Sequence, residues 1–386
     1  MPHFGDYQAE IYLQGLAGLP PSLPVTFEEL ERAAHAAMTR EAWGYVAGGA
    51  GSERTARANA AAFERWRIMP RLLRGTAERD LSVELLGTAS PAPVLLAPVG
   101  VLGLVHPDAE LAVARAARTL GLPMVLSTVG SVSLEDVAAE LGGSPGWFQL
   151  YWPKDRDVAA SLVGRAEAAG YRAIVLTVDT LVLAWRPRDL AQGYLPFLRG
   201  QGLANYLADP AFRAGLAAAP EQDPRAAVLH WAGMFSHLEL RWEDLAWLRS
   251  ITGLPILLKG VSHPDDARRA VDAGMDGVIV SNHGGRQVDG AVAALDCLPG
   301  VAEAAGGVPV LFDSGIRGGS DVLTALALGA RAVLVGRPYV YGLALAGADG
   351  VRHVLRCLLA DLDLTCALVG LHTVAEVSAE VLVPRP

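Results

Sequence analysis

The residues best suited to chemistry in this chain follow directly after short apolar runs. The stretch SNHGGRQVDG at 281–290 places His283 and Arg286 three residues apart. A neutral imidazole, with a pKa of about 6.5, can accept a proton, and a guanidinium can hold a carboxylate through two hydrogen bonds. The pair therefore predicts proton abstraction from an anionic substrate, with Asp179 from another apolar run orienting the imidazole. The alternative is a structural, hydrogen-bonded histidine.

Lysine is rare in this chain, and its position is informative. Of the 32 basic residues only Lys154 and Lys259 are lysines, and codon or thermal bias accounts for most of the arginines. Lys259 ends the apolar run ILLKG, where its ammonium would be largely buried. It is interpreted either as a structural salt bridge to Asp313 or as a point charge beside a cofactor that becomes anionic on reduction.

Two glycine-rich stretches predict an anion site. DSGIRGGSD (313–321) precedes an apparent helix, and VGRP (335–338) follows the next apolar run. Backbone N–H groups and a helix N-terminus at such turns bind phosphate in many barrels. Arg317 and Arg337 would then pair with the phosphate. The alternative is a glycine-rich turn with solvated arginines.

The elements that must position these groups alternate between buried strands and amphipathic helices. Eight continuous apolar runs predict parallel strands that are covered on both faces. Helical patterns such as 108–120, 155–170 and 320–329 separate them, which favours a (β/α)8 barrel over a doubly wound sheet, because no GxGxxG follows the first strand. The predicted strands are 93–98, 123–127, 147–151, 173–179, 255–260, 277–282, 309–315 and 332–338.

In a barrel, polar residues at the carboxyl ends of the strands face one common site. Each residue alone could be a loop anchor, but their shared position predicts a single site. That site would collect Gln149, Tyr151, Thr177, Asp179, Lys259, Ser281, His283, Arg286, Asp313, Arg317, Gly336 and Arg337.

Two regions lie outside the repeat. Residues 1–92 are expected to form a helical segment that packs on the barrel, and residues 93–386 the barrel with its C-terminal helices. Residues 187–241 follow the fourth strand with poor periodicity, and loops of this length in compact domains are usually functional or disordered. A loop after a barrel strand lies over the active site, so this one is predicted to be a lid.

Composition excludes several classes of protein. The formal net charge of −9 argues against nucleic-acid binding through a basic face, and 52% hydrophobic residues argue against disorder. Three scattered cysteines predict no disulfide framework, and no metal-binding histidine spacing occurs, so no metal is expected. With neither a signal peptide nor a membrane span apparent, a cytoplasmic location is expected.

These motifs together resemble one family. SNHGGRQVDG, FDSGIRGGSDVLTALALGARAVLVGRP, PILLKGV and FQLYWPKDRD are similar to the FMN-dependent 2-hydroxy acid oxidases and dehydrogenases, over essentially the whole chain. Within the family, GDYQAEIYLQGLAG, YVAGGAGSERTARAN, AWRPRDL, PFLRGQGLANYLADPAF and LHWAGMF look closest to the lactate 2-monooxygenase subgroup. VHPDAE and the aspartate of RQVDG are instead typical of the general family.

The resemblance implies FMN as cofactor and a role for each matching residue. His283 would be the catalytic base with Asp179 as its partner, and Lys259 would stabilise the reduced flavin. The substrate would be bound by Tyr45, Tyr151, Arg186 and Arg286. The flavin ring would be lined by Ala97, Pro98, Val99, Gly100, Ser127, Gln149, Thr177 and Ser281, and the ribityl phosphate held by Asp313, Gly315, Arg317, Gly336 and Arg337.

Three positions differ from many family members. Glycine at Gly100 is expected to leave more room beside the flavin than alanine would, Val129 stands where several glycolate-type members carry an aromatic residue, and Trp185 replaces an arginine. These differences argue against glycolate as the best substrate.

The resemblance therefore implies oxidation of L-lactate or a similar small L-2-hydroxy acid by O2. A product retained under the lid would be decarboxylated to acetate, CO2 and water, whereas a quickly released one would leave as pyruvate with hydrogen peroxide. The motifs are also compatible with a dehydrogenase that uses another electron acceptor and with a flavin-binding protein without turnover. A homotetramer is expected.

Overall fold

The computed structural model describes residues 3–385 and contains a closed barrel of eight parallel strands. Each strand pairs with the next along the chain, and β11 pairs with β4 to close the barrel. The predicted (β/α)8 barrel is therefore confirmed. The strands are β4 Val94–Leu96, β5 Met124–Ser127, β6 Gly146–Leu150, β7 Ile174–Thr177, β8 Ile256–Val261, β9 Gly277–Val280, β10 Val310–Phe312 and β11 Ala332–Val335.

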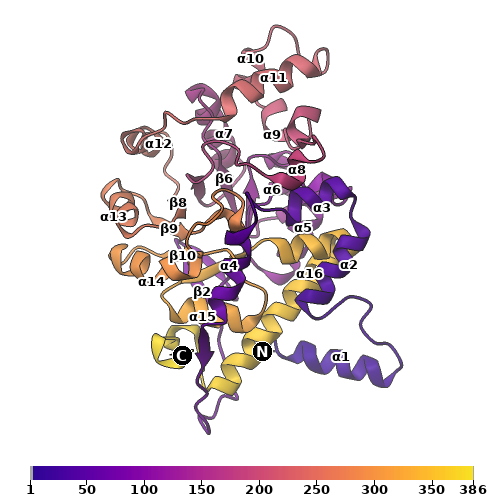
Figure 1. Cartoon of the computed structure of the whole chain (residues 1–386), viewed down its shortest axis with the longest axis vertical. Helices are drawn as coiled ribbons and strands as arrows, with labels where there is room; N and C mark the ends of the chain where they lie inside the picture. The colour runs from indigo at the N-terminus through magenta and orange to yellow at the C-terminus, as the bar shows by residue number, and fades with distance from the viewer. Residues whose placement is uncertain (1–2, 386) are drawn as a thin grey trace.

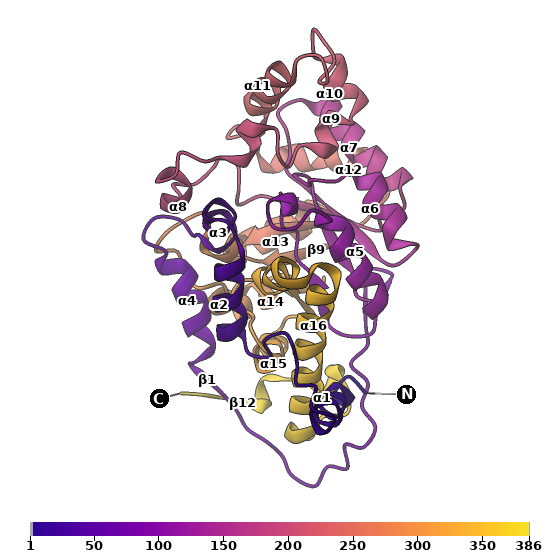
Figure 2. The same cartoon turned by 90° about the vertical axis from the view of Figure 1, so that its right-hand side faces the viewer.

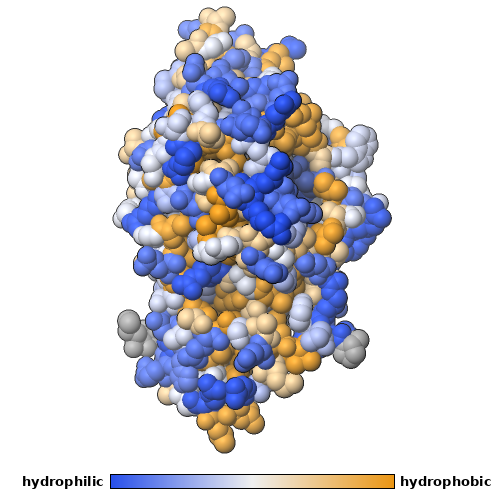
Figure 3. All heavy atoms as spheres, turned by 90° about the vertical axis from the view of Figure 1, so that its left-hand side faces the viewer, coloured by the Kyte–Doolittle hydropathy of each residue, from blue (hydrophilic) through white to orange (hydrophobic). Residues whose placement is uncertain are grey.

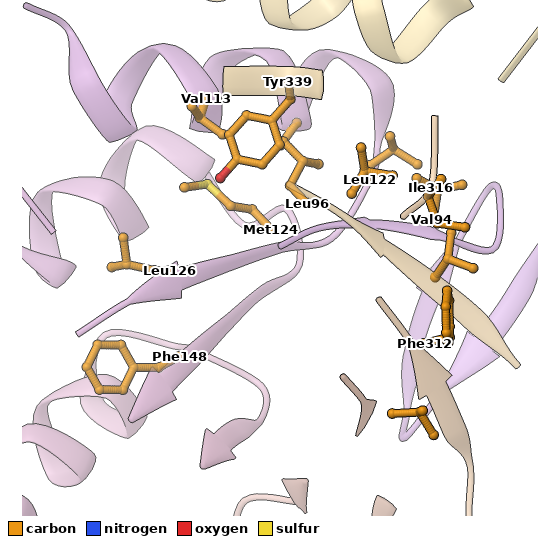
Figure 4. Close-up of a cluster of buried hydrophobic side chains, with 14 of the residues drawn as sticks. Val94, Leu96, Val113, Leu122, Met124, Leu126, Phe148, Phe312, Ile316 and Tyr339 are labelled. Atoms are coloured by element: carbon orange, nitrogen blue, oxygen red, sulfur yellow. The ribbon is translucent and has the colours of Figure 1, made fainter. Parts of the chain in front are cut away.

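The barrel strands are buried on both faces, which explains their continuous apolar sequences. Inward-facing side chains such as Leu95, Val125 and Leu257 fill the interior. Outward-facing ones contact the surrounding helices: Figure 4 shows Leu96 and Met124 beside the ring of Tyr339. Only at the carboxyl ends of the strands do the inward positions become polar, and this places the chemistry at one mouth of the barrel.

A helix follows each strand and covers the outside of the barrel (Figure 1). The last helix is the longest and continues to the small C-terminal elements η5 Val374–Glu376, η6 Ala379–Val381 and β12 Leu382–Pro384. The barrel helices are α5 Ala109–Leu120, α6 Leu134–Leu141, α7 Arg156–Ala168, α12 Leu245–Ser250, α13 Pro264–Asp272, α14 Ala294–Ala304, α15 Gly319–Ala327 and α16 Arg337–Val369.

The N-terminal segment contains short strands as well as the expected helices. Its helices are α1 Asp6–Leu16, α2 Phe27–Ala37, α3 Arg40–Ala47 and α4 Arg54–Phe63, and Figure 2 shows the last three along one side of the barrel. β1 Trp66–Ile68 pairs with β12. The hairpin of β2 Val83–Leu85 and β3 Thr88–Ser90 closes the amino end of the barrel, where Thr88 accepts a hydrogen bond from the buried Trp147 indole at 3.2 Å.

The predicted lid follows β7 and lies over the barrel mouth, at the top of Figure 1. It is mostly helical rather than irregular, and Asp209 and Asp223 each cap a helix that begins with proline. Four of its helices have only four or five residues, too few to show a clear period in the sequence. The helices are α8 Pro187–Leu190, η2 Pro196–Arg199, α9 Ala204–Leu207, α10 Pro210–Ala214 and α11 Pro224–Phe235, and η3 Trp242–Asp244 follows them.

The face of the molecule drawn in Figure 3 carries hydrophilic and apolar residues side by side. Several of the exposed apolar side chains, including Tyr12, Leu13 and Leu16, lie on α1. Within residues 3–385 no helix is both long and apolar enough to cross a membrane.

Candidate active site

A cavity of about 1040 Å³, counted with its mouth, opens at the carboxyl end of the barrel. Ligand pockets commonly have volumes of about 300–1,000 Å³, so this one can hold a ligand of cofactor size. It brings together residues from the N-terminal segment, from all eight strand ends and from the insertion after β7, which is the predicted lid. Of the residues predicted for the site, those that line it are Tyr45, Ala97, Pro98, Val99, Gly100, Tyr151, Arg186, Lys259, His283, Arg286, Asp313, Gly315, Arg317, Gly336 and Arg337.

His283 lies on this cavity and is held by Asp179, as the sequence predicted. Its Nδ1 is 2.9 Å from Asp179 Oδ1 and 3.1 Å from the hydroxyl of Thr180, while its Nε2 lies 3.4 Å from the hydroxyl of Tyr151. The carboxylate favours the tautomer with the proton on Nδ1. Nε2 is then a free base that faces the cavity.

The charges around His283 suit a base. Burial lowers the pKa of His283 and outweighs the opposing effect of Asp179, so the imidazole is neutral at pH 7. Burial raises the pKa of Asp179, but His283 and Lys259 lower it by more, and the carboxylate is ionised. A neutral imidazole beside a fixed carboxylate can take a proton and keep the resulting cation stable.

Lys259 and Asp313 form a buried ion pair at the barrel mouth. The ammonium lies 2.8 Å from Asp313 and donates to the hydroxyl of Ser281 at 3.0 Å. Burial lowers the pKa of Lys259, whereas Asp313 and Asp179 raise it by more, so the lysine is charged. The salt-bridge interpretation is therefore correct. It does not exclude the second interpretation, because both Lys259 and Asp313 also line the cavity.

Arg186 and Arg286 face the cavity beside Tyr45. Arg186 donates to the Gln287 side chain at 2.9 Å, and Arg286 donates to the carbonyl of Gly48 at 2.7 Å. The Arg286 guanidinium lies 5.2 Å from the centre of the Tyr45 ring. Burial, followed by the charge of Arg186, lowers the pKa of Arg286 to about 9.

Arg317 and Arg337 occupy the glycine-rich part of the cavity. Arg337 donates to three backbone carbonyls, those of Val46, Gly48 and Gly284, each at 3.0 Å. Arg317 lies 4.2 Å from the centre of the Phe27 ring, and burial, followed by Arg337, lowers its pKa to about 10.

The helix N-terminus next to these arginines is already occupied. Asp321 accepts hydrogen bonds from the backbone N–H groups of Arg317 and Gly318, and Asp361 accepts one from Gly319. The sequence predicted that the backbone N–H groups at the start of α15 would bind a phosphate. In the structure side-chain carboxylates satisfy three of them, which leaves the guanidinium groups of Arg317 and Arg337 as the charged donors of this part of the cavity. Asp313 pairs with Lys259 and is an acceptor, which suits hydroxyl groups rather than a phosphate.

Four guanidinium groups therefore line one cavity without a carboxylate partner. Among residues 3–385 none of the four lies within 4.0 Å of a carboxylate oxygen, and hydrogen bonds to neutral oxygens replace ion pairs. Buried arginines are normally paired, so this surplus of positive charge indicates anionic ligands. A phosphate-bearing cofactor together with a carboxylate substrate fits it. No cluster of three metal-ligating side chains occurs in the same residues.

Four residues predicted to line the flavin, Ser127, Gln149, Thr177 and Ser281, are not among the residues that line the cavity but are hydrogen-bonded at the strand ends. Gln149 accepts from the hydroxyl of Ser127 at 3.2 Å and donates to Thr177 at 3.0 Å. Ser281 accepts from Lys259 and from the backbone N–H of His283, both at 3.0 Å. They connect neighbouring strand ends and hold the charged residues above them.

The sequence predicted free space beside Gly100, but the structure shows that Val129 occupies it. A Cβ atom at this position would lie 2.5 Å from the Val129 side chain and 2.9 Å from the Val129 carbonyl. Val129 therefore fills the room that the missing methyl group was expected to leave. Glycine is required here by the close approach of the neighbouring loop.

Other residues of the cavity wall were not predicted from sequence. Phe197 and Phe235 belong to the insertion and cover the cavity beside Tyr151, with ring centres 5.6 Å apart for Tyr151 and Phe235. Thr180 and Ser314 immediately follow predicted site residues, so their sequence positions could have indicated that they lie at the site. For the two phenylalanines no such signal exists, because they lie in the aperiodic insertion.

Comparison with known proteins agrees with this geometry. A model of the FMN-dependent dehydrogenase family matches residues 34–384. The chain is 44% identical over 379 residues to the FMN-dependent alpha-hydroxy acid dehydrogenase qulF of Penicillium citrinum, covering 97% of this chain and 94% of that relative. It is 43% identical over 362 residues to an L-lactate oxidase of Lysinibacillus sphaericus (strain C3-41), covering 94% and 93%.

A solved structure is similar as well. The crystal structure of mandelate oxidase superposes with a TM-score of 0.83 at 42% identity, covering 94% of this chain and 98% of that one. The match of the family model over most of the chain confirms the resemblance that the motifs carried, and with it FMN as the cofactor. The chain thus belongs to the family of FMN-dependent dehydrogenases that act on 2-hydroxy acids.

Proposed function

We propose that this protein oxidises L-lactate or a similar small L-2-hydroxy acid at its α-carbon, with O2 as electron acceptor. The observation that carries the proposal is the pairing of an Asp179-held His283 with Arg186 and Arg286 on one cavity. The base and the two cations face the same space, as removal of a proton from a bound carboxylate substrate requires.

Each side chain has a part in this reaction. Arg186 and Arg286 bind the substrate carboxylate, and the hydroxyls of Tyr45 and Tyr151 donate hydrogen bonds to the substrate. His283 Nε2 takes the proton, and the charge of Asp179 stabilises the imidazolium that forms. FMN, when bound, supplies the two-electron acceptor.

The cofactor would be held at two ends of the cavity. Arg317 and Arg337 supply cationic donors for the phosphate, and Asp313 supplies an acceptor for ribityl hydroxyls. The ammonium of Lys259 lies where it can stabilise negative charge on the ring after reduction. Ala97, Pro98 and Val99 offer an uncharged wall for the ring.

The insertion supports decarboxylation of a retained product. Phe197 and Phe235 cover the cavity with apolar rings and pack against Trp231. Pyruvate formed from L-lactate and held beneath them together with hydrogen peroxide would be converted to acetate, CO2 and water, the outcome of a lactate 2-monooxygenase. The second candidate is an oxidase that releases the 2-oxo acid and hydrogen peroxide, favoured by the L-lactate oxidase and mandelate oxidase among the similar proteins.

Two measurements on the purified FMN-loaded protein test these proposals. Anaerobic addition of L-lactate should bleach the flavin absorbance, and His283→Ala should retain the flavin without bleaching. Bleaching by that variant at the wild-type rate would remove His283 as the base. In air, acetate without free peroxide supports the monooxygenase, whereas one peroxide per lactate supports the oxidase and refutes decarboxylation.

We also propose a homotetramer, which the resemblance implies, and a cytoplasmic location, which the few scattered cysteines favour. Light scattering of the purified protein tests the assembly, and a mass of one or two chains would refute it. Imaging of a tagged chain in its host tests the location.

A further inference from the structure

The loop that carries His283 has an unusual backbone. His283, Gly284 and Gly285 all have positive φ values, 58°, 64° and 77°. Glycine adopts this region freely, but a residue with a side chain is strained there. Such conformations persist only where the surroundings hold them in place. Something must therefore fix this loop so that the imidazole points at Asp179.

Two amides, a buried one on α4 and a half-buried one in the loop, form a reciprocal pair. Asn59 donates to the side-chain oxygen of Asn282 at 2.7 Å, and Asn282 donates back to the side-chain oxygen of Asn59 at 2.7 Å. Asn59 is only 2% exposed. The two side chains come from residues 223 positions apart, so this pair joins α4 directly to the loop.

Three further hydrogen bonds connect these amides to the loop backbone. The Asn282 oxygen also accepts from the N–H of Gly285 at 3.1 Å, and its nitrogen donates to the carbonyl of Val292 at 3.1 Å. The Asn59 oxygen also accepts from the N–H of Ala294 at 3.0 Å. The pair therefore joins the left-handed turn at 283–285 to the start of α14, and closes the loop between them.

The helix that supplies Asn59 packs closely on the same turn. A Cβ atom at Gly285 would lie 2.4 Å from the backbone nitrogen of Ala56. One turn before Asn59, Thr55 donates to the carbonyl of Val288 at 2.8 Å and accepts from the N–H of Ala291 at 3.0 Å. Residues four apart lie on one face of a helix, so Thr55 and Asn59 present a polar face to the loop.

We propose that Asn59 is a positioning residue for the base: through Asn282 it holds the left-handed turn that presents His283 to Asp179 and to the cavity. This inference rests on the proposed function only in naming His283 as the base. The placement of the loop itself can be measured in the chain without substrate. The N-terminal segment thus contributes to the site through α4 as well as through Tyr45.

The test compares Asn59→Ala with Ala60→Gly. Ala60 is the exposed neighbour on α4, so its substitution weakens the helix without touching the loop. We expect Asn59→Ala to speed amide hydrogen exchange across residues 282–294 at least about tenfold, because a buried hydrogen-bonded pair is lost. The 15N NMR signal of the Asp179-bound His283 Nδ1 should broaden, and anaerobic flavin reduction by L-lactate should slow by about tenfold to hundredfold. Ala60→Gly should change none of the three, and both variants should retain FMN.

Asn59→Ser is smaller and keeps one hydroxyl that can donate or accept a hydrogen bond, so its effects should be intermediate. It also serves as the test if Asn59→Ala does not fold. Wild-type exchange protection and His283 signals in both Asn59 variants, or equal changes in Ala60→Gly, would overturn the proposal. If the wild-type protein does not react with L-lactate, the proposed function fails, while the exchange and NMR measurements still decide the role of Asn59.

Discussion

The contact between Asp179 and His283 allows a quantitative prediction. Replacing Asp179 by asparagine keeps the size of the side chain and removes its charge. Two unit charges about 4 Å apart attract by about 4 kcal/mol at an effective dielectric constant of about 20. A hydrogen bond to a charged group contributes about 1.5–3 kcal/mol. The imidazolium that forms when His283 takes the substrate proton, with its Nδ1 2.9 Å from the carboxylate, loses an amount in this range.

Since about 1.4 kcal/mol corresponds to one factor of ten, Asp179→Asn should lower the rate of flavin reduction by about tenfold to thousandfold. A larger loss is expected if the new amide donates to Nδ1, because the imidazole proton then moves to Nε2, the atom that must accept the substrate proton. Asp179 raises the pKa of His283, so the acid limb of the rate–pH profile should also move to lower pH as the plateau falls.

Stopped-flow absorbance under anaerobic conditions measures both effects. Asp272→Asn, at an exposed position on α13, is the matched control and should behave as the wild type. An unchanged plateau in Asp179→Asn, or an acid limb displaced to higher pH, would refute the assigned role of the pair.

Three further outcomes are expected. Burial lowers the pKa of His283, and a base works above its pKa, so kcat/KM of the wild type should rise with pH with an apparent pKa below about 6.5 and then stay level. A rise centred above that pH would contradict His283 as the base. Lys259→Met leaves the buried Asp313 without its cationic partner, so urea unfolding of the apoprotein should show a free energy of unfolding lower by about 3–5 kcal/mol. Adding Asp313→Leu should recover most of this loss, and an unchanged unfolding midpoint in Lys259→Met would exclude a stabilising ion pair. Gly100→Ala should lower the free energy of unfolding by about 1–3 kcal/mol, as overpacking does, and adding Val129→Ala should restore only part of it, because the carbonyl of residue 129 stays in place. Full recovery would show that the Val129 side chain alone causes the steric clash.

Much of the site could be predicted because residues that follow the strands of a parallel barrel meet at one end of it. Polar residues directly after apolar strands, such as Lys259 and Asp313, must meet at the carboxyl mouth once the strands are parallel and closed. The same reasoning brought His283 and Asp179 together. Motif resemblance added residues that strand ends could not indicate, among them Tyr45 and Arg186.

What could not be predicted depends on contacts between distant segments. The insertion shows no clear periodicity because most of its helices have only four or five residues, and nothing in its sequence pattern places Phe197 and Phe235 over the cavity. Nor does the sequence show that Val129 fills the space beside Gly100, since packing against a neighbouring loop is a property of the folded backbone.

The sequence by itself determined the strands, their order and the chemical groups at their ends, because burial on both faces demands continuous apolar runs and leaves the polar residues at the mouth. The tertiary structure alone decided how those groups are held. Asn59 and Asn282 are two ordinary amides until the fold brings them 2.7 Å apart. A hydrogen bond between residues so far apart in the chain has no local signature, because its geometry arises only when helix and barrel pack together.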